Sequence, residues 1–174
     1  MNVRLGLLGV VVVLAGCVEV APRPNRSKGQ PKNAEASAPS APAAKGAPKF
    51  IAASDGTAEA TIQAAMVAAK QEQRTVVVYV GASWCEPCQY FHEAVEAGRL
   101  DEPLAGVTFV EFDSDRDGER LVAAGYDGRL IPRFALPGED GRFGGTKIEG
   151  GIKGEGAVEH IMRRLGPMLA TASR

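Results

Sequence analysis

The chain has 174 residues, of which 45% are hydrophobic and 24% are charged, an ordinary composition for one globular domain. Its formal net charge of -1 and its aromatic content of 6% disfavour a nucleic-acid-binding protein, which needs basic or stacking surfaces. Three cysteines are too few for a small disulfide-stapled protein. No apolar run reaches the ~18 residues that a membrane-spanning helix needs.

Residues 1–16 have the pattern of a secretory signal peptide: Arg4 precedes an apolar run at residues 5–16 that ends in small residues. The run closes with Leu14-Ala15-Gly16-Cys17, which resembles the lipobox of bacterial lipoproteins. In that family the signal is cleaved before the cysteine, whose thiol carries a diacylglycerol. The resemblance implies that Cys17 is lipidated and anchors the protein to a membrane, facing an extracytoplasmic space. The alternative is a soluble exported protein in which Cys17 has no role.

Residues 17–48 are predicted to hold the anchor and a disordered tether. Six prolines and an Ala/Ser-rich stretch leave no large apolar side chain after Val20, so this segment cannot form a core. Its basic residues either attract anionic lipid headgroups or only keep the tether in solution.

Residues 49–174 are predicted to form one α/β domain. Apolar periodicity and turn residues place its helices at 57–73, from Cys85 onwards, at 119–124 and at 156–169. Strands are expected at 75–80, 107–112, 133–136 and 142–148, with a further edge strand at 50–52. The first two of these strands are predicted to be parallel and central, and the last two to form an antiparallel hairpin at the edge. Pro167 is expected to break or bend the last helical turn.

Cys85-Glu86-Pro87-Cys88 directly follows a buried strand and opens a helix. A thiol at a helix start meets unpaired N–H groups and the positive end of the helix dipole, which favour the thiolate. Attack by Cys85 on a disulfide would give a mixed disulfide that Cys88, one helical turn later, resolves. Pro87 is suited to an early helical position. Redox chemistry is therefore the leading interpretation of this motif.

Three other interpretations of the motif remain open. A C-x2-C pair can be half of a zinc site, although only His92 and His160 are available as further ligands. The pair can also be a purely structural disulfide, or a site that delivers a metal such as copper.

Residues 76–91 (VVVYVGASWCEPCQYF) resemble the active-site region of the thioredoxin superfamily, Ile131-Pro132 resembles its cis-proline loop, and residues 147–154 resemble its last strand and turn. The resemblance implies a thioredoxin-like three-layer α/β/α sandwich with a central mixed sheet. It also implies that Cys85 attacks, that Cys88 resolves and that the two form a redox-active disulfide. Trp84 would shield the site, and Pro132, in a cis peptide, would border a groove that pairs with the substrate backbone.

The sequence departs from the family at the strand that precedes the motif. Thioredoxins keep a buried aspartate six residues before the first cysteine, where this chain has Tyr79. Glu111 or Asp113, on the neighbouring strand, is a candidate replacement for that proton acceptor, and an ordinary surface role is the alternative for both. His92 is interpreted as a packed helix residue rather than a base, and Trp84 has core packing as its alternative role.

Two further departures concern charge near the cysteines. Glu86 is expected to raise the thiol pKa, against the helix dipole. The dipeptide Glu86-Pro87 also resembles that of membrane-anchored reductases of cytochrome c maturation. Arg133 either favours the thiolate, binds an acidic partner or is a solvated arginine at a strand start. The segment at residues 125–130 is longer than in thioredoxin and is expected to influence partner choice.

The resulting hypothesis is an anchored, extracytoplasmic thiol–disulfide oxidoreductase that reduces exported proteins and needs no organic cofactor. Its expected partners are proteins with cysteines or disulfides, a membrane protein that donates electrons, and the membrane itself through Cys17, with no nucleic acid. A disulfide oxidase or isomerase is one alternative. A non-catalytic thioredoxin-fold module that binds peptide, haem or copper is the other.

Overall fold

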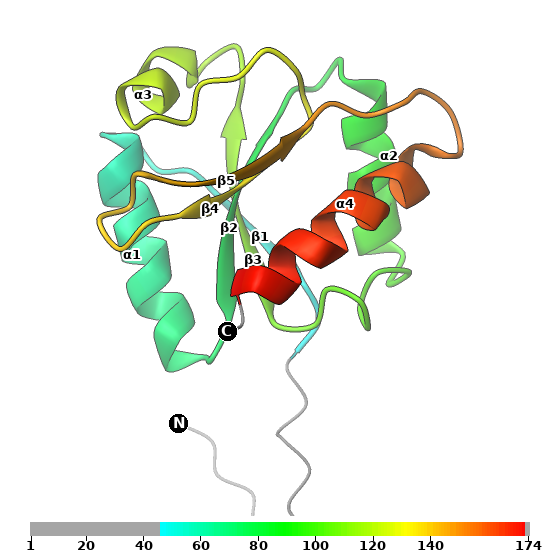
Figure 1. Ribbon diagram of the computed structural model, residues 1–174, viewed down its shortest axis with the longest axis horizontal. Helices are drawn as coiled ribbons and strands as arrows, with labels where there is room; N and C mark the ends of the chain where they lie inside the picture. The colour runs from blue at the N-terminus through cyan, green and yellow to red at the C-terminus, as the bar shows by residue number, and fades with distance from the viewer. Residues whose placement is uncertain (1–45, 173–174) are drawn as a thin grey trace, which may run out of the picture. The chain divides into compact units, whose positions relative to one another are not determined.

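The computed structural model describes residues 46–172, and the domain that they form is shown in Figure 1. The signal peptide, Cys17 and nearly all of the tether lie outside the described residues. Within residues 46–172, no helix is both long and apolar enough to cross a membrane.

Five strands and four helices follow one another in the order β1, α1, β2, α2, β3, α3, β4, β5 and α4 (Figure 1). The strands are β1 (Lys49–Ala52), β2 (Thr75–Gly81), β3 (Val107–Asp113), β4 (Arg133–Pro137) and β5 (Phe143–Glu149). The helices are α1 (Ala58–Gln71), α2 (Glu86–Glu96), α3 (Gly118–Ala123) and α4 (Ala157–Ala172). Each element expected from the sequence is present, with ends that differ by a few residues.

The strands form one mixed sheet in the order β1-β3-β2-β4-β5. β3 pairs in parallel with both β1 and β2, whereas β4 is antiparallel to β2 and to β5. The expected edge strand at residues 50–52 is thus confirmed as part of β1. β2 is central, and its apolar sequence fits a strand covered on both faces.

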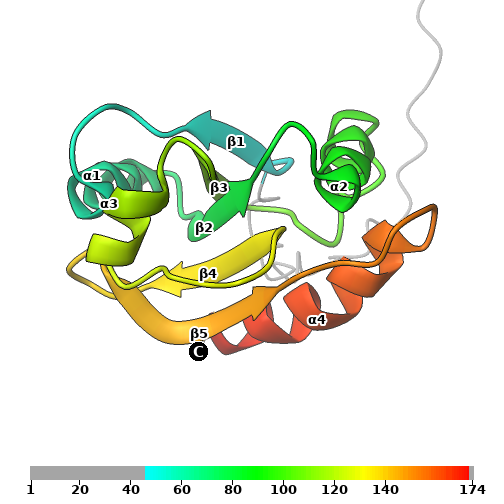
Figure 2. The same cartoon turned by 90° about the horizontal axis from the view of Figure 1, so that it is seen from above.

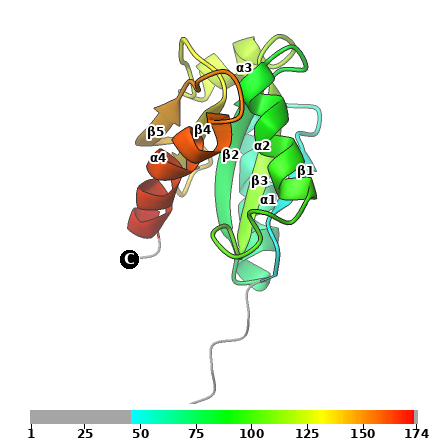
Figure 3. The ribbon, with the colours of Figure 1, turned by 90° about the vertical axis from the view of Figure 1, so that its right-hand side faces the viewer.

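Each face of the sheet is covered by two helices, α1 and α3 on one side and α2 and α4 on the other (Figure 2). Alternate residues of β2 divide between the two cores: Val76 and Val78 face α1, and Val77 and Tyr79 face α2. α2 and α4 pack against each other on their shared face (Figure 3). This arrangement is the thioredoxin-like α/β/α sandwich.

Pro167 lies inside the last helix and does not end it, so of the expected break or bend the break is wrong. α4 continues through Pro167 to Ala172. A proline inside a helix removes one backbone hydrogen bond and crowds the preceding turn. Leu165 and Met168, on either side of Pro167, are buried against the α2 core, and this packing offsets the lost bond.

An aromatic cluster lies beneath the α2 face. Phe91 is fully buried, and its ring centroid lies 5.0 Å from that of Phe134, 5.6 Å from that of Phe109 and 6.1 Å from that of Tyr79. These pairs have favourable edge and tilted geometries. Phe91 therefore anchors the helix that carries both cysteines.

We expect Phe91→Ala to lower the free energy of unfolding by about 3–5 kcal/mol, because it removes a fully buried ring and leaves a cavity. Urea unfolding followed by circular dichroism measures the change. Val122→Ala, on the exposed side of α3, is the control and is expected to change it by less than about 0.5 kcal/mol. Equal effects of the two substitutions would contradict this account of the core.

Candidate active site

Cys85 and Cys88 form a disulfide at the beginning of α2, with an S–S distance of 2.06 Å and a Cα–Cα distance of 5.2 Å. Cys85 is the N-cap residue of the helix and Cys88 lies in its first turn. Both are buried, with 4% and 2% of their surfaces exposed. The sulfurs are thus held next to the unpaired N–H groups of a helix start, where a thiolate is stabilised once the disulfide is reduced.

The local chain path explains why the helix begins there. The N–H of Cys85 donates to the carbonyl of Ala82 at 3.1 Å and closes the turn that leaves β2. The carbonyl of Cys85 then accepts the N–H of Gln89, also at 3.1 Å. Pro87 falls within the first two helical positions, where its missing N–H has no partner to lose.

The second segment at the site is the loop before β4. The peptide bond between Ile131 and Pro132 is cis, the geometry that the thioredoxin resemblance implies. The carbonyl of Pro132 accepts the N–H of Gly150 at 2.8 Å. A Cβ added to Gly151 would lie 2.8 Å from the Cβ of Pro87 and 3.4 Å from the Cδ of Pro132. Only glycine therefore lets the segment after β5 pass between the two prolines.

Trp84 stands on the surface beside the disulfide, with 66% of it exposed. Its indole N–H donates to a carboxylate oxygen of Asp115 at 2.7 Å, which fixes the ring orientation. This exposure excludes core packing as its role. Leu130 and Ile152 are also exposed apolar side chains, one next to the cis peptide and one in the segment after β5.

The side chain of Glu86 is hydrogen-bonded to the loop between β5 and α4, which is the third segment of the site. One of its carboxylate oxygens accepts the N–H of Gly154 at 2.9 Å, which ties the first turn of α2 to the loop before α4. An acidic side chain in the first turn also interacts favourably with the helix dipole. Glu86 thus has a clear role in holding this loop.

Arg133 is buried, so the interpretation of Arg133 as a solvated arginine at a strand start is wrong. Its side chain is buried, and its guanidinium lies 3.4 Å from Glu149 and donates to the carbonyl of Tyr126 at 2.8 Å. A Cβ on Gly128 would collide with both Arg133 and Glu149. The loop at residues 125–130 therefore folds over Arg133, which supports the path of the chain into Pro132.

Tyr79 occupies the strand position of the family's buried aspartate and is fully buried. Burial, and then the negative charge of Glu111, raise the pKa of the Tyr79 phenol well above its ordinary value, so the phenol stays protonated. Within residues 46–172 its hydroxyl has no hydrogen-bond partner. A Cβ on Gly81 would lie 2.6 Å from this hydroxyl, which therefore points along β2 towards the turn that carries the cysteines.

The structure joins two residues that the sequence analysis considered separately. His92 Nε2 lies 2.9 Å from a carboxylate oxygen of Glu111, and the His92 ring stacks on Phe50 with centroids 4.1 Å apart. The sequence held a signal for this pair: His92 follows Cys88 by one helical turn, and Glu111 alternates onto the same face of β3 as Phe109. The expected role of His92 as a packed helix residue is incomplete without Glu111.

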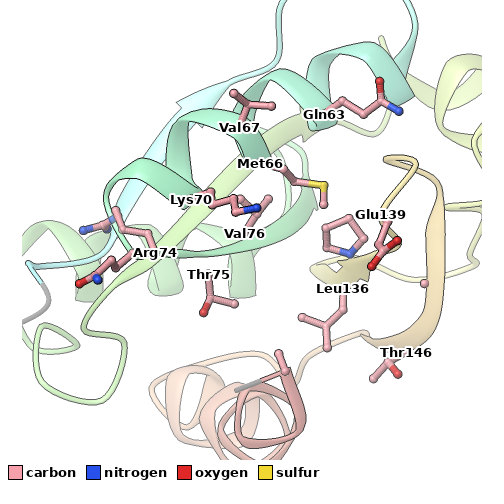
Figure 4. Close-up of a pocket in the computed structure, with 14 residues that line it drawn as sticks. Gln63, Met66, Val67, Lys70, Arg74, Thr75, Val76, Leu136, Glu139 and Thr146 are labelled. Atoms are coloured by element: carbon pink, nitrogen blue, oxygen red, sulfur yellow. The ribbon is translucent and has the colours of Figure 1, made fainter. Parts of the chain in front are cut away.

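A cavity of about 380 Å³ opens beside the disulfide. Its walls include Cys88, Tyr79, His92 and Glu111. A larger hollow, of about 840 Å³, lies between α1, the start of β2 and the β4–β5 hairpin (Figure 4). Of these two, the smaller cavity has Cys88 in its wall, whereas the larger hollow is lined by neither cysteine.

We expect Arg133→Met to lower the free energy of unfolding by about 1–3 kcal/mol, because it leaves the buried carbonyl of Tyr126 without a donor. Arg129→Met, an exposed arginine of the same loop, is the matched control, with an expected change below about 0.5 kcal/mol. Chemical denaturation of the two variants measures the difference. An Arg133→Met variant as stable as the parent would show that the arginine does not support the loop.

Residues 57–136 match a family model described as thioredoxin-like. Two solved structures are similar over most of their own length. The chain shares 21% identity with a thioredoxin from Trichomonas vaginalis (TM-score 0.44; 70% of this chain and 96% of that chain covered). It shares 22% with a disulfide isomerase from Xylella fastidiosa Temecula1 (TM-score 0.47; 68% and 93%). No curated protein matches the chain. The chain thus contains a domain of thioredoxin-like fold with a C-x2-C disulfide at the start of its second helix, a combination that supports thiol–disulfide oxidoreductase activity.

Proposed function

We propose that this protein is a membrane-anchored, extracytoplasmic thiol–disulfide oxidoreductase that reduces disulfides of exported proteins through Cys85 and Cys88. The disulfide at the start of α2, with Cys85 as N-cap residue, is the observation that carries the proposal. A strand, a thiol pair and a helix follow in the order that nucleophilic attack and resolution need.

The reaction uses only the two sulfurs. In the reduced protein the Cys85 thiolate attacks one sulfur of a client disulfide, and the other client sulfur leaves as a thiolate that takes up a proton. Cys88 then loses its proton and attacks the Cys85 sulfur. The Cys85–Cys88 disulfide forms, and the second client sulfur leaves and is protonated. Two electrons pass from the protein to the client, and the two protons that the client takes up are that of Cys88 and one from solvent, so no further cofactor is needed.

Cys85 is assigned as the attacking residue because it stands at the N-cap next to the exposed Trp84, whereas Cys88 lies deeper in the helix turn. A client would meet the exposed apolar side chains of Trp84, Leu130 and Ile152 around the sulfurs. The backbone beside the cis peptide at Pro132 would pair with the extended client chain, a form of strand addition.

Reduction is favoured over oxidation because Glu86-Pro87 resembles the motif of membrane-anchored reductases. A reductase must be recharged, and we propose a membrane protein that delivers electrons to the Cys85–Cys88 disulfide. The redox potential distinguishes the alternatives: thioredoxin lies near about -270 mV and a strong bacterial oxidant near about -120 mV. A value near the second figure would identify an oxidase or isomerase.

The location outside the cytoplasm is proposed from the signal-like residues 1–16 and the lipobox-like end at Cys17. A Pro-rich tether spans ~3 Å per residue where it is extended, so residues 17–48 would let the domain reach clients and an electron donor at some distance from the bilayer.

We expect Cys85→Ser to abolish the reduction of insulin by dithiothreitol above the uncatalysed rate, because the attacking thiol is removed and the remaining thiol of the motif, Cys88, is buried. Cys88→Ser is expected to trap a covalent mixed disulfide, visible as a larger species on a non-reducing gel. Cys17→Ser is the matched control and should retain full activity in this assay. Unchanged activity of Cys85→Ser would refute the enzyme and leave a thioredoxin-fold binding module.

We expect Cys17→Ser to move the full chain from the membrane fraction of a bacterial host to the soluble fraction, because the acyl chains that hold a lipoprotein on a bilayer would be missing. Immunoblots of fractionated cells measure the distribution. Cys88→Ser should stay in the membrane fraction. A Cys17→Ser protein that remains membrane-bound would contradict the lipid anchor, whatever the outcome of the insulin assay.

A further inference from the structure

The missing buried aspartate leaves open how Cys88 loses its proton before it attacks Cys85. The sheet register offers a replacement for that acid. Tyr79 of β2 pairs with Glu111 of β3, so the Glu111 carboxylate lies directly beside the position that Tyr79 fills. On its other side Glu111 pairs with Ala52 of β1, whose small side chain leaves space at the sheet edge. A carboxylate is therefore present one strand away from its place in thioredoxins.

Glu111 holds His92 in a defined orientation. His92 Nε2 is 2.9 Å from the Glu111 carboxylate. The imidazole also lies between two aromatic rings: it stacks on Phe50 with ring centroids 4.1 Å apart, and it meets Tyr79 in an edge geometry with centroids 5.3 Å apart. Both side chains are partly accessible to solvent, with 27% of the His92 side chain and 36% of the Glu111 side chain exposed. Water in the adjoining cavity can therefore reach the pair.

Cys88 and this pair open into one cavity. Cys88, Tyr79, His92 and Glu111 all line the space of about 380 Å³. A water molecule occupies ~30 Å³ in the liquid, so the cavity has room for a hydrogen-bonded water path. The Tyr79 hydroxyl, buried and without a partner among the groups of residues 46–172, is a ready donor or acceptor for such a water.

The other titratable groups that line the cavity are less suited to accept a proton. Asp113 is occupied by the backbone: one of its oxygens accepts the N–H groups of Asp115 and Arg116 at 2.9 and 3.0 Å. Arg116 donates two hydrogen bonds to Asp117 and is a permanent cation. Tyr79 stays protonated for the reasons given above. An imidazole is the side chain that exchanges protons most readily near neutral pH, which favours His92.

We propose that His92, oriented by Glu111, accepts the proton of Cys88 through water in this cavity and so activates the resolving cysteine. The proposal rests on the proposed oxidoreductase function and adds a proton acceptor to its second step. The Cys88 proton passes to the neutral imidazole, whose positive charge then faces the Glu111 carboxylate. The Cys88 thiolate forms the bond to Cys85, and the departing client thiolate takes up a proton, which returns His92 to its neutral form.

The test separates the two steps in one trace. A symmetrical aromatic disulfide that releases a coloured thiolate at each step is mixed with the reduced full chain carrying Cys17→Ser, so that only Cys85 and Cys88 react. The first phase reports attack by Cys85 and depends on reagent concentration. The second phase reports resolution by Cys88 and is independent of it.

We expect His92→Gln to leave the first phase unchanged and to slow the second on the order of 100-fold at pH 7, the usual contribution of a positioned acid or base. A free thiol titrates near pH ~8.5. In His92→Gln the second phase should therefore rise with pH only through this thiol range and approach the parent rate above pH ~9, whereas in the parent it should already be fast at pH 7.

Two further variants complete the experiment. His160→Gln, in α4 and outside the cavity walls, is the matched control and should leave both phases and the pH profile as in the parent. Glu111→Gln keeps a polar partner for His92 without the charge and is expected to give an intermediate second-phase rate. It also preserves the stack on Phe50, so it decides the question if His92→Gln does not fold.

The outcomes separate this inference from the proposed function. A second phase in His92→Gln and Glu111→Gln that matches the parent in rate and pH profile would overturn the proton acceptor and leave the oxidoreductase standing. Absence of the first phase in the parent would refute the oxidoreductase itself.

Discussion

Strand β2 is buried along almost its whole length and ends at Gly81, so the chain must turn away from the sheet before α2 begins five residues later. The turn places Cys85 at the N-cap, and this residue makes no side-chain capping hydrogen bond. The N–H groups of the first turn, which a serine or aspartate cap would otherwise occupy, are left available to a sulfur anion. The chemistry of the domain depends on this junction between a rigid strand and an uncapped helix.

Three chain segments that are distant in sequence meet at the junction, and each is held by a polar contact that takes no part in the reaction. Glu86 binds the backbone at Gly154, Trp84 is fixed by Asp115, and Arg133 supports the loop that leads to Pro132. A site assembled from separate segments needs such supports, because the reacting atoms must be held to within fractions of an ångström. Glu86 and Arg133, whose charge suggested an electrostatic role in sequence, thus also support the chain segments that form the site.

The sequence predicted the elements well because each has a strong local signal. The apolar run at β2 and the periodic apolar residues of α1 and α4 depend on burial alone, and burial is encoded by the residues themselves. The cysteine pair and the Ile131-Pro132 dipeptide are contiguous motifs and were equally visible. Arg133 and Pro167 were misjudged because their outcome depends on partners far along the chain: the carbonyl of Tyr126 in one case and the packing around Leu165 and Met168 in the other. The pairing of His92 with Glu111 depends in the same way on strand register, which local patterns fix only indirectly.

Tyr79 stands where thioredoxins have a buried acid, and this replacement changes the place at which charge develops during the reaction. A carboxylate in the centre of a sheet must be ionised in a medium that solvates it poorly, and its burial opposes folding. Tyr79 instead fills that position with a neutral ring that contacts Phe91 and Phe134, so the core beneath the cysteines remains apolar and uncharged. Glu111 and His92 instead line the cavity wall, and their side chains are partly exposed. On our proposal the proton of Cys88 is therefore accepted at this wall and not by a charged group inside the core.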